Sequence, residues 1–328
     1  MKRTLRLGFT YDLRDEYIRE GMSPEAAAEF DKAETIDAIA ASLENLGHRV
    51  DRVGRLKRLV ERLAAGDRWD MAFNIAEGAA GFAREAQVPA LLEAYSLPAV
   101  FSDAFVLAVA LHKGATKTLM RAAGIRTPGF MVFGDADVAD AARRLRFPLF
   151  CKPVAEGTGK GVEARGRVET ARDLGERVGD LLARFRQPVL VEEYLPGREF
   201  TVGIVGTGEK AGVLGVMEVL LNDRAEPGVY SYANKDDYEE RVDYRLADDR
   251  EALAAGDLAL ASYRALGCRD AGRVDIRSDA DGLPSFIEIN PLAGLNHIHS
   301  DLPIICRLRG NSFDDLIRWI MDSAMERL

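Results

Sequence analysis

The stretch Val274–Asn290, VDIRSDADGLPSFIEIN, has the pattern of two short strands joined by a polar turn. Asp275 lies near the start of the first strand, and Glu288 and Asn290 lie at the end of the second. Glu288 and Asn290 point the same way because residues two apart share one face of a strand, and Arg273 shares a face with Asp275 for the same reason. Mg²⁺ prefers carboxylate oxygens together with phosphate oxygens and water. We therefore predict a magnesium site on this hairpin; a hairpin braced only by salt bridges is the alternative.

A glycine-rich segment stands upstream, at Phe150–Val162, with the sequence FCKPVAEGTGKGV. Lys152 ends a predicted buried strand, and Gly157, Gly159 and Gly161 follow it. Glycine lets backbone N–H groups approach phosphate oxygens, and a lysine adds a positive charge. The segment matches neither the P-loop nor the dinucleotide-binding pattern. It predicts a phosphate-binding loop, and a tight hairpin with a surface lysine is the alternative.

Acidic residues end a third segment, Val189–Phe200, with the sequence VLVEEYLPGREF. The exposed backbone after such a strand can bond to a purine edge, and one of the carboxylates of Glu192, Glu193 and Glu199 can hold ribose hydroxyls. A solvated charged edge would explain this segment by itself. The three segments together, in this order, predict a site for a nucleotide and a metal.

The composition limits the classes of function. The chain has 328 residues and a net charge of −9, which argues against general binding to nucleic acid or to a membrane surface. No apolar run approaches the roughly 20 residues of a membrane span. Cys151, Cys268 and Cys306 are far apart, which favours reduced thiols over a disulfide framework. We expect a cytoplasmic protein with no nucleic-acid or membrane partner.

The order of the predicted elements indicates an α/β region followed by α+β regions. In the first region we predict strands at 4–9, 48–53, 69–75 and 98–101, and helices at 23–47, 55–65 and 87–97. In the next we predict helices at 103–124, 136–146 and 169–185, and strands at 128–133, 147–153 and 188–195. In the last we predict antiparallel strands at 198–205, 211–221, 272–277 and 285–290, a polar loop at 222–246, and helices at 248–267 and 312–327. The predicted domains are 1–111, 112–196 and 197–328.

These segments resemble those of ATP-grasp enzymes, and the stretch LPAVFSDAFVLAVALHKGATKTLMRAAGIRTP, residues 97–128, resembles the D-alanine–D-alanine ligases. The resemblance covers most of the chain, from about Phe73 to Pro303. It implies an ATP-grasp fold with an N-terminal Rossmann-like domain. It also implies an ATP-dependent carboxylate–amine ligase that forms an acyl phosphate, with ATP and Mg²⁺ as cofactors (Mn²⁺ is also compatible). Amino acids or other carboxylic acids would be the small-molecule substrates, and a homodimer is expected.

The resemblance implies a role for each matching residue. The implied ATP-binding residues are Lys113, Lys152, Glu156, Gly157, Thr158, Gly159, Gly161, Glu192, Glu193, Leu195 and Glu199. The implied metal ligands are Asp275, Glu288 and Asn290. Lys235, from a lid within the polar loop, would reach the γ-phosphate, and Arg273 and the backbone of Gly294 would stabilise the oxyanion.

The departures from the ligase pattern fall where those enzymes bind their amino acids. Glu77 replaces a histidine, Phe82-Ala83-Arg84 replaces an acidic turn, and the segment after Gly294 has one extra residue. We expect an altered substrate pocket, in which Glu77 holds an ammonium group and Arg84 clamps a carboxylate; the alternative for Arg84 is a surface pair with Glu85. The predicted substrate-binding residues are Glu77, Arg84, Asn296, His299 and Ser300, with Glu85, Tyr11 and Asp12 nearby. A strict D-alanine–D-alanine ligase of cell-wall synthesis and a nucleotide-binding regulator without turnover are the alternatives.

Overall fold

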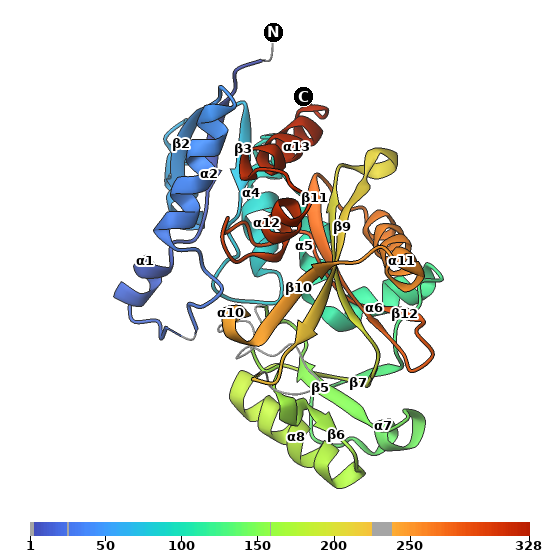
Figure 1. The fold of residues 1–328 in the computed structure, drawn as a ribbon. Helices are drawn as coiled ribbons and strands as arrows, with labels where there is room; N and C mark the ends of the chain where they lie inside the picture. Colours follow the sequence, from blue (N-terminus) through green and yellow to red (C-terminus); the bar gives the residue numbers. More distant parts are fainter. Residues whose placement is uncertain (1–2, 25, 158, 225–237) are drawn as a thin grey trace.

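The computed structural model describes residues 3–24, 26–157, 159–224 and 238–328. Its N-terminal part contains a parallel sheet in the order β2-β1-β3. The strands are β1 (Arg6–Thr10), β2 (Arg49–Gly54) and β3 (Met71–Asn74), and the helices are α1 (Arg14–Arg19), α2 (Ala33–Asn45), α3 (Leu56–Ala64) and α4 (Gln87–Ala94). Strands that alternate with helices in a parallel sheet form a Rossmann-like unit, shown in blue and cyan in Figure 1.

The middle of the chain forms an antiparallel sheet in the order β4-β7-β5-β6. Its strands are β4 (Phe130–Phe133), β5 (Leu149–Pro153), β6 (Arg167–Val168) and β7 (Val189–Glu193), and its helices are α7 (Ala139–Arg144) and α8 (Ala171–Phe185). Leu174, Val178 and Leu181 recur at helical spacing along α8 and are buried in one core with residues of β5 and β7. This packing fixes the sheet from which the glycine-rich loop emerges.

The C-terminal part holds an antiparallel sheet in the order β10-β9-β8-β11-β12. Its strands are β8 (Glu199–Val205), β9 (Gly212–Leu221), β10 (Val242–Leu246), β11 (Ala271–Ser278) and β12 (Pro284–Asn290), and the helices are α10 (Tyr238–Arg241), α11 (Arg250–Leu266) and α12 (Asp301–Leu308). Helix α11 covers one face of the sheet and α12 the other, because the two helices join different core clusters with alternate residues of β9. Asp249 caps α11 by accepting from the N–H groups of Glu251 and Ala252, and Gly267 ends it with a φ of 80°.

The two ends of the chain lie together. Helix α13 (Phe313–Met325) packs against α2, and both helices share one hydrophobic core with β1 and β3 (Figure 1). Arg327 donates to the carboxylate of Asp270 at 2.7 Å and to the carbonyl of Ala99 at 2.9 Å. These contacts join the Rossmann-like unit to the last sheet. Helices α5 (Ala104–Leu111) and α6 (Lys113–Ala122) connect the Rossmann-like unit to the middle sheet.

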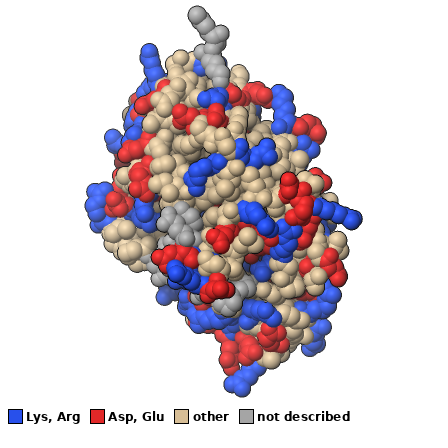
Figure 2. Space-filling model, viewed as in Figure 1, with Lys and Arg blue, Asp and Glu red and all other residues tan. Residues whose placement is uncertain are grey.

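No described helix is both long and apolar enough to cross a membrane. On the face shown in Figure 2, acidic and basic side chains lie interspersed rather than in one large area of a single sign. Three short 3₁₀-helices, at Arg84–Ala86, Ala164–Gly166 and Gly208–Lys210, complete the described secondary structure.

The predicted helix at 23–47 is wrong in its first part, because only α2, Ala33–Asn45, is helical. Arg14 donates to the carbonyls of Ala28 and Phe30, and the N–H of Asp31 bonds to the carbonyl of Asp12. The backbone groups that a longer helix would need are therefore bonded to the N-terminal segment instead. Helix α1 was not predicted.

The predicted helix at 103–124 is two helices, which meet at His112, where φ is −89° and ψ is 88°. The ring of His112 accepts from the N–H of Ala115 and so caps α6, whose first residue, Lys113, donates its N–H to the carbonyl of Val154. The predicted strand at 98–101 is reduced to one bridge between Ala72 and Ala99. The polar loop at 222–246 contains α10 and strand β10, and α12 lies in a segment for which no helix was predicted.

Candidate active site

A cavity of about 90 Å³ lies between the middle and C-terminal sheets. The residues predicted for ATP or metal that line it are Lys113, Lys152, Glu156, Gly159, Glu192, Glu193, Leu195, Glu199, Asp275 and Glu288. Gly157 lines a neighbouring cavity instead, and Gly161 lines neither. Thr158 and Lys235 lie outside the described residues. The three motifs, far apart in sequence, thus surround one space.

Glu192 lies between two buried lysines. Its carboxylate is 2.7 Å from the Nζ of Lys152 and 2.8 Å from the Nζ of Lys117. Burial pushes the pKa of Glu192 up, but the two ammonium groups outweigh burial and hold it below its usual value. Burial lowers the pKa of Lys117 to about 8, although Glu192 opposes this shift. Two lysines therefore share one carboxylate here, and Lys117, which does not itself line the cavity, is a member that the sequence analysis missed.

Glu193 also lines this cavity, but its carboxylate does not join the lysines. Its carboxylate is 3.1 Å from the guanidinium of Arg146, and it also accepts from the backbone N–H of Arg146. Adjacent residues on a strand face opposite sides of the sheet, so only one carboxylate of this pair can face the lysines. The structure therefore places the predicted side chain of Glu193 away from Lys152.

Glu199 is held at the other end of this cavity. Arg277 donates to the carboxylate of Glu199 and to the hydroxyl of Tyr194, both at 3.1 Å. All three residues line the cavity. A carboxylate fixed by a guanidinium keeps one direction, which suits it to accept hydrogen bonds from hydroxyl groups of a ligand.

The hairpin β11–β12 gathers the predicted metal ligands. Asp275 lies directly opposite Glu288, and Arg273 directly opposite Asn290, so these side chains share one face. Two carboxylates and an amide form a hard-oxygen donor set, which fits a divalent cation whose shell is completed by phosphate oxygens. Within the described ranges, no group of three or more His, Cys, Asp and Glu side chains is placed to hold a metal ion.

Cations of the protein lie against the same carboxylates. The Nζ of Lys113 is 3.5 Å from Glu288 and donates to the carbonyl of Glu156 at 2.6 Å. Arg273 is 3.2 Å from Asp275 and 2.5 Å from Asp301. The site therefore places positive groups next to the donor set, where a polyphosphate would need them.

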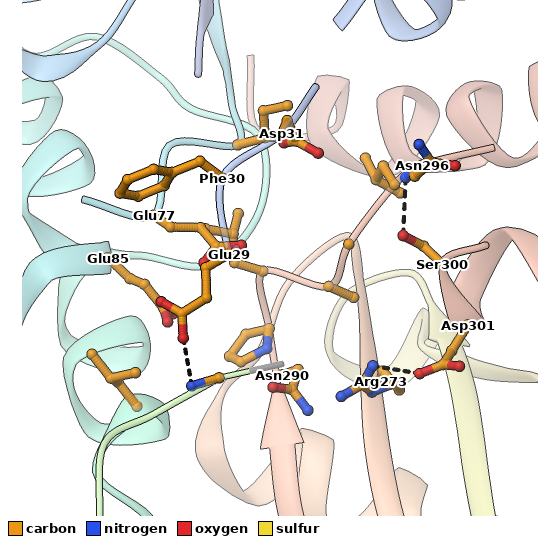
Figure 3. A pocket seen from close by; sticks show the side chains of 18 of the residues that line it. Glu29, Phe30, Asp31, Glu77, Glu85, Arg273, Asn290, Asn296, Ser300 and Asp301 are labelled. Carbon is orange, nitrogen blue, oxygen red and sulfur yellow. Dashed lines mark hydrogen bonds and ion pairs between the residues drawn. The ribbon is translucent and has the colours of Figure 1, made fainter. Parts of the chain in front are cut away.

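A second cavity, of about 230 Å³, opens next to the first and shares Lys113, Glu156 and Glu288 with it. In Figure 3, Glu29, Glu77 and Glu85 lie on one side of this cavity, and Asn290, Arg273 and Asp301 on the other. The predicted residues that line it are Glu77, Glu85, Lys113, Glu156, Gly157, Arg273, Glu288, Asn290, Gly294, Asn296, His299 and Ser300. Arg84 does not line it, and neither do Tyr11 and Asp12.

Glu29 ties the N-terminal segment to the glycine-rich loop. Its carboxylate accepts from the N–H of Gly157 at 2.7 Å and lies 3.1 Å from the guanidinium of Arg84. Arg84 also donates to the carbonyl of Ala155 at 2.9 Å. Because its guanidinium is bonded to the protein, Arg84 supports the loop and does not line the second cavity. Glu29 was not predicted, because it was assigned to a helix.

Three carboxylates of this cavity, those of Asp31, Glu77 and Glu85, make no hydrogen bond or ion pair with a described residue. Burial raises the pKa of Asp31 to about 7, although Arg14 opposes the shift. Burial, opposed by Arg84 and assisted by Glu29, raises the pKa of Glu85 to about 7. Burial and then the neighbouring Glu29 raise the pKa of Glu77 well above its usual value. Crowded carboxylates without partners give the cavity an acidic wall.

The segment after β12 forms the remaining wall. Ser300 Oγ accepts from the N–H of Asn296 at 3.0 Å, and the Asn296 amide donates to the hydroxyl of Thr35 at 2.9 Å. A side chain at Gly294 would come within 2.8 Å of Ser300 Oγ, which explains glycine there. Burial, followed by Lys32, lowers the pKa of His299. Asn296 thus braces this loop, while His299 and Ser300 face the cavity.

Comparisons with known proteins show the family to which the chain belongs. Residues 119–322 match the sequence model of the family described as "D-ala D-ala ligase C-terminus". The D-alanine–D-alanine ligase of Bordetella petrii is 34% identical over 271 residues, which cover 82% of this chain and 79% of that protein.

Two solved structures share the fold over nearly the whole chain. The D-alanine–D-alanine ligase of Bacillus anthracis complexed with ATP has a TM-score of 0.73 and 21% identity, and the match covers 98% of both chains. VanG D-Ala:D-Ser ligase of Enterococcus faecalis has a TM-score of 0.72 and 18% identity, covering 98% of this chain and 100% of that chain. The predicted ATP-grasp fold with a Rossmann-like N-terminal unit is confirmed, and the chain belongs to the D-alanine–D-alanine ligase family of ATP-dependent ligases.

Proposed function

We propose that this ligase joins a carboxylic acid to an amine through an acyl phosphate, and that its acid or its amine differs from D-alanine. The observation that carries the proposal is the junction of the two cavities. Lys113, Glu156 and Glu288 line both, so the terminal phosphate of a nucleotide in one cavity would meet a substrate in the other. Holding both reactants in this way removes much of the entropic barrier to their reaction.

In this proposal the nucleotide lies along the smaller cavity, which we call the nucleotide cavity. The acid and the amine lie in the larger one, the substrate cavity. The strand end from Glu192 to Leu195 binds the adenine edge, Glu199 accepts from the ribose hydroxyls, and Lys152 and the loop at 156–161 contact the phosphates. The support is that these residues line one space and that Glu199 is fixed by Arg277. Lys235 is proposed to reach the γ-phosphate.

Asp275, Glu288 and Asn290 are proposed to hold Mg²⁺, with Mn²⁺ as a compatible substitute. When bound, the ion neutralises negative charge on the phosphates. Lys113 and Arg273 already lie against the two carboxylates and supply further positive charge at the same place. Phosphoryl transfer depends mainly on such positioning and charge stabilisation.

The reaction proceeds in two steps. A carboxylate oxygen of the acid attacks the γ-phosphorus, the bond to the bridging oxygen breaks, and ADP leaves with an acyl phosphate formed. The nitrogen of the amine then attacks the acyl carbon, and phosphate and one proton are released. Arg273 and the backbone N–H of Gly294 are proposed to donate to the oxyanion of the tetrahedral intermediate, since both residues line the substrate cavity.

The acidic wall supports a substrate other than D-alanine. Glu77 lines the cavity where the ligases carry a histidine, and Glu85 and Asp31 lie beside it without partners among the described residues. A strict D-alanine–D-alanine ligase remains the second candidate, because the family includes such enzymes. A regulator without turnover is disfavoured, because the charged residues of the nucleotide cavity are retained.

Phosphate release from ATP and Mg²⁺ tests the proposal across pairs of D- and L-amino acids. Release that depends on a pair other than D-alanine with itself supports it. Release with D-alanine alone supports cell-wall synthesis, and no release with any pair supports the regulator. The homodimer and the domain boundaries at 111/112 and 196/197 stay predictions, which light scattering and limited proteolysis would check.

A further inference from the structure

The charges around the substrate cavity do not balance within the described part of the chain. Among the described residues, seven carboxylates line it, but the lysines and arginines that do so are Arg14, Lys32, Lys113 and Arg273. Four of the carboxylates have partners: Glu29 pairs with Arg84, Glu156 accepts from Gln187, Glu288 pairs with Lys113, and Asp301 pairs with Arg273. Asp31, Glu77 and Glu85 remain.

Among the described residues, nearby cations act on these carboxylates without pairing with them: Arg14 opposes the rise in the pKa of Asp31, and Arg84 opposes that of Glu85. Arg14 donates to the backbone carbonyls of Ala28 and Phe30, and the Nζ of Lys32 lies 4.0 Å from Glu34. Burying a carboxylate without a partner costs free energy, and here burial raises the pKa of both Glu77 and Glu85. A site that carries this cost has a use for cationic groups that the described protein does not supply.

On the opposite side of the cavity, the side chain of Asn290 has a hydrogen-bond donor without an acceptor among the described residues. The amide nitrogen of Asn290 is buried and no described atom accepts a hydrogen bond from it. Asn290 lies beside Arg273, across the cavity from Glu77 and Glu85 (Figure 3). A buried donor without an acceptor calls for an explanation, and an oxygen of a ligand in this cavity would supply one. The cavity therefore has the amide donor of Asn290, unpaired among the described residues and beside Arg273, on one side and the carboxylates of Glu77 and Glu85 on the other.

We propose that this cavity binds an amino acid with two amino groups, whose carboxylate lies toward Asn290 and Lys113 and whose two ammonium groups lie among Asp31, Glu77 and Glu85. The inference rests on the proposed ligase function and names the class of its substrate. An amino acid with a neutral side chain supplies one ammonium group and leaves two of the three carboxylates without a partner. A diamino acid pairs two of them and places its carboxylate where the two cavities meet.

Binding tests the inference without turnover. The probes are matched pairs that differ in one amino group: 2,4-diaminobutyrate with 2-aminobutyrate, and ornithine with norvaline, each as D and L forms. Isothermal titration in the presence of ADP and Mg²⁺ gives the dissociation constants. We expect at least one diamino acid to bind about ten-fold or more tightly than its neutral partner, since charge-assisted hydrogen bonds are stronger than neutral ones.

The variants Glu77→Gln and Glu85→Gln keep the shape of the wall and remove its charge. Each should bring the ratio of dissociation constants within a pair toward one. Glu44→Gln, an exposed glutamate on α2, is the matched control and should leave the ratio unchanged.

The outcomes separate this inference from the ligase function. If every neutral partner binds as tightly as its diamino acid, the inference is overturned, even where phosphate release shows that the ligase function stands. A preference for diamino acids that persists in both variants also overturns it. A preference that the variants abolish supports it, even if no pair tested gives phosphate release.

Discussion

The two cavities of the site treat charge in opposite ways. In the nucleotide cavity, Glu192 pairs with two lysines and Glu199 pairs with Arg277. In the substrate cavity, three carboxylates have no partner among the described residues. A cavity whose charges are already paired is preorganised, so its geometry exists before the ligand arrives. In a cavity with unpaired carboxylates, the ligand supplies the groups that pair with them. The sign and number of the unpaired charges therefore indicate which groups the ligand carries.

Glu288 offers the severest test, because it belongs to both cavities. Glu288→Gln removes a proposed metal ligand and the partner of Lys113. We expect turnover to fall by about 10³-fold or more, since a bound metal ion contributes several kcal/mol to such reactions. Phosphate release measured against Mg²⁺ concentration checks this, with the exposed Glu209→Gln as control. Turnover with an unchanged Mg²⁺ dependence would remove Glu288 from the metal site.

Replacing Arg273 should lower the rate of the chemical step and leave ATP binding in place. Arg273→Gln removes a proposed oxyanion donor, and loss of one such donor costs about 10²–10³-fold in turnover. ATP binding should persist, because Arg273 does not line the nucleotide cavity. Single-turnover phosphate release and nucleotide titration separate the two effects. Turnover within a few fold of the original would show that the oxyanion role is wrong.

Glu85, one of the three carboxylates without a described partner in the substrate cavity, should lower the stability of the fold. The pKa of Glu85 in the fold is about 7, raised by burial from its usual value of 4.5. A raised carboxyl pKa means that the native state binds the proton more tightly, so stability is lost as the pH rises from about 4.5 to about 7 and the loss is complete above it. Glu85→Gln should therefore raise the free energy of unfolding at pH 8, by up to about 3 kcal/mol, and by less at pH 5.

Urea unfolding of both proteins at the two pH values measures this difference. If Glu85→Gln raised the free energy of unfolding equally at pH 5 and pH 8, burial would not be disfavouring the charged form of Glu85. The same variant is predicted to weaken binding of a diamino acid, so a stability gain and a binding loss would come from one charge.

The nucleotide cavity was predictable because its residues stand in short motifs at strand ends. Asp275 and Glu288 are separated only by a turn, and strand alternation alone places them on one face. Lys117 could have been found in the same way, since it lies four residues after Lys113 on one helix face. Periodicity and spacing are local signals, and they suffice where the site is built from local structure.

The substrate cavity was less predictable, because part of it depends on tertiary contacts. Residues 23–32 have a helix-compatible sequence, but Arg14 bonds to the carbonyls of Ala28 and Phe30 and holds residues 26–30 in a turn. That turn places Glu29 on the glycine-rich loop and Asp31 in the cavity. No local signal marks either residue. The departure at Glu77 was visible in the sequence, whereas the bonding of Arg84 to Glu29 and Ala155 was not.

The adjacent residues Glu192 and Glu193 give the smallest effect and a direct comparison on one strand. Glu193→Gln should change the KM for ATP by less than about two-fold, because its carboxylate pairs with Arg146, whose side chain is 88% exposed. Glu192→Gln should raise that KM by about ten-fold or more, because it leaves two buried lysines without their shared carboxylate. Steady-state kinetics at saturating substrate measures both. An increase of ten-fold in the Glu193 variant would mean that this carboxylate leaves Arg146 to contact the nucleotide, and that the face on which a strand residue lies does not decide its role here.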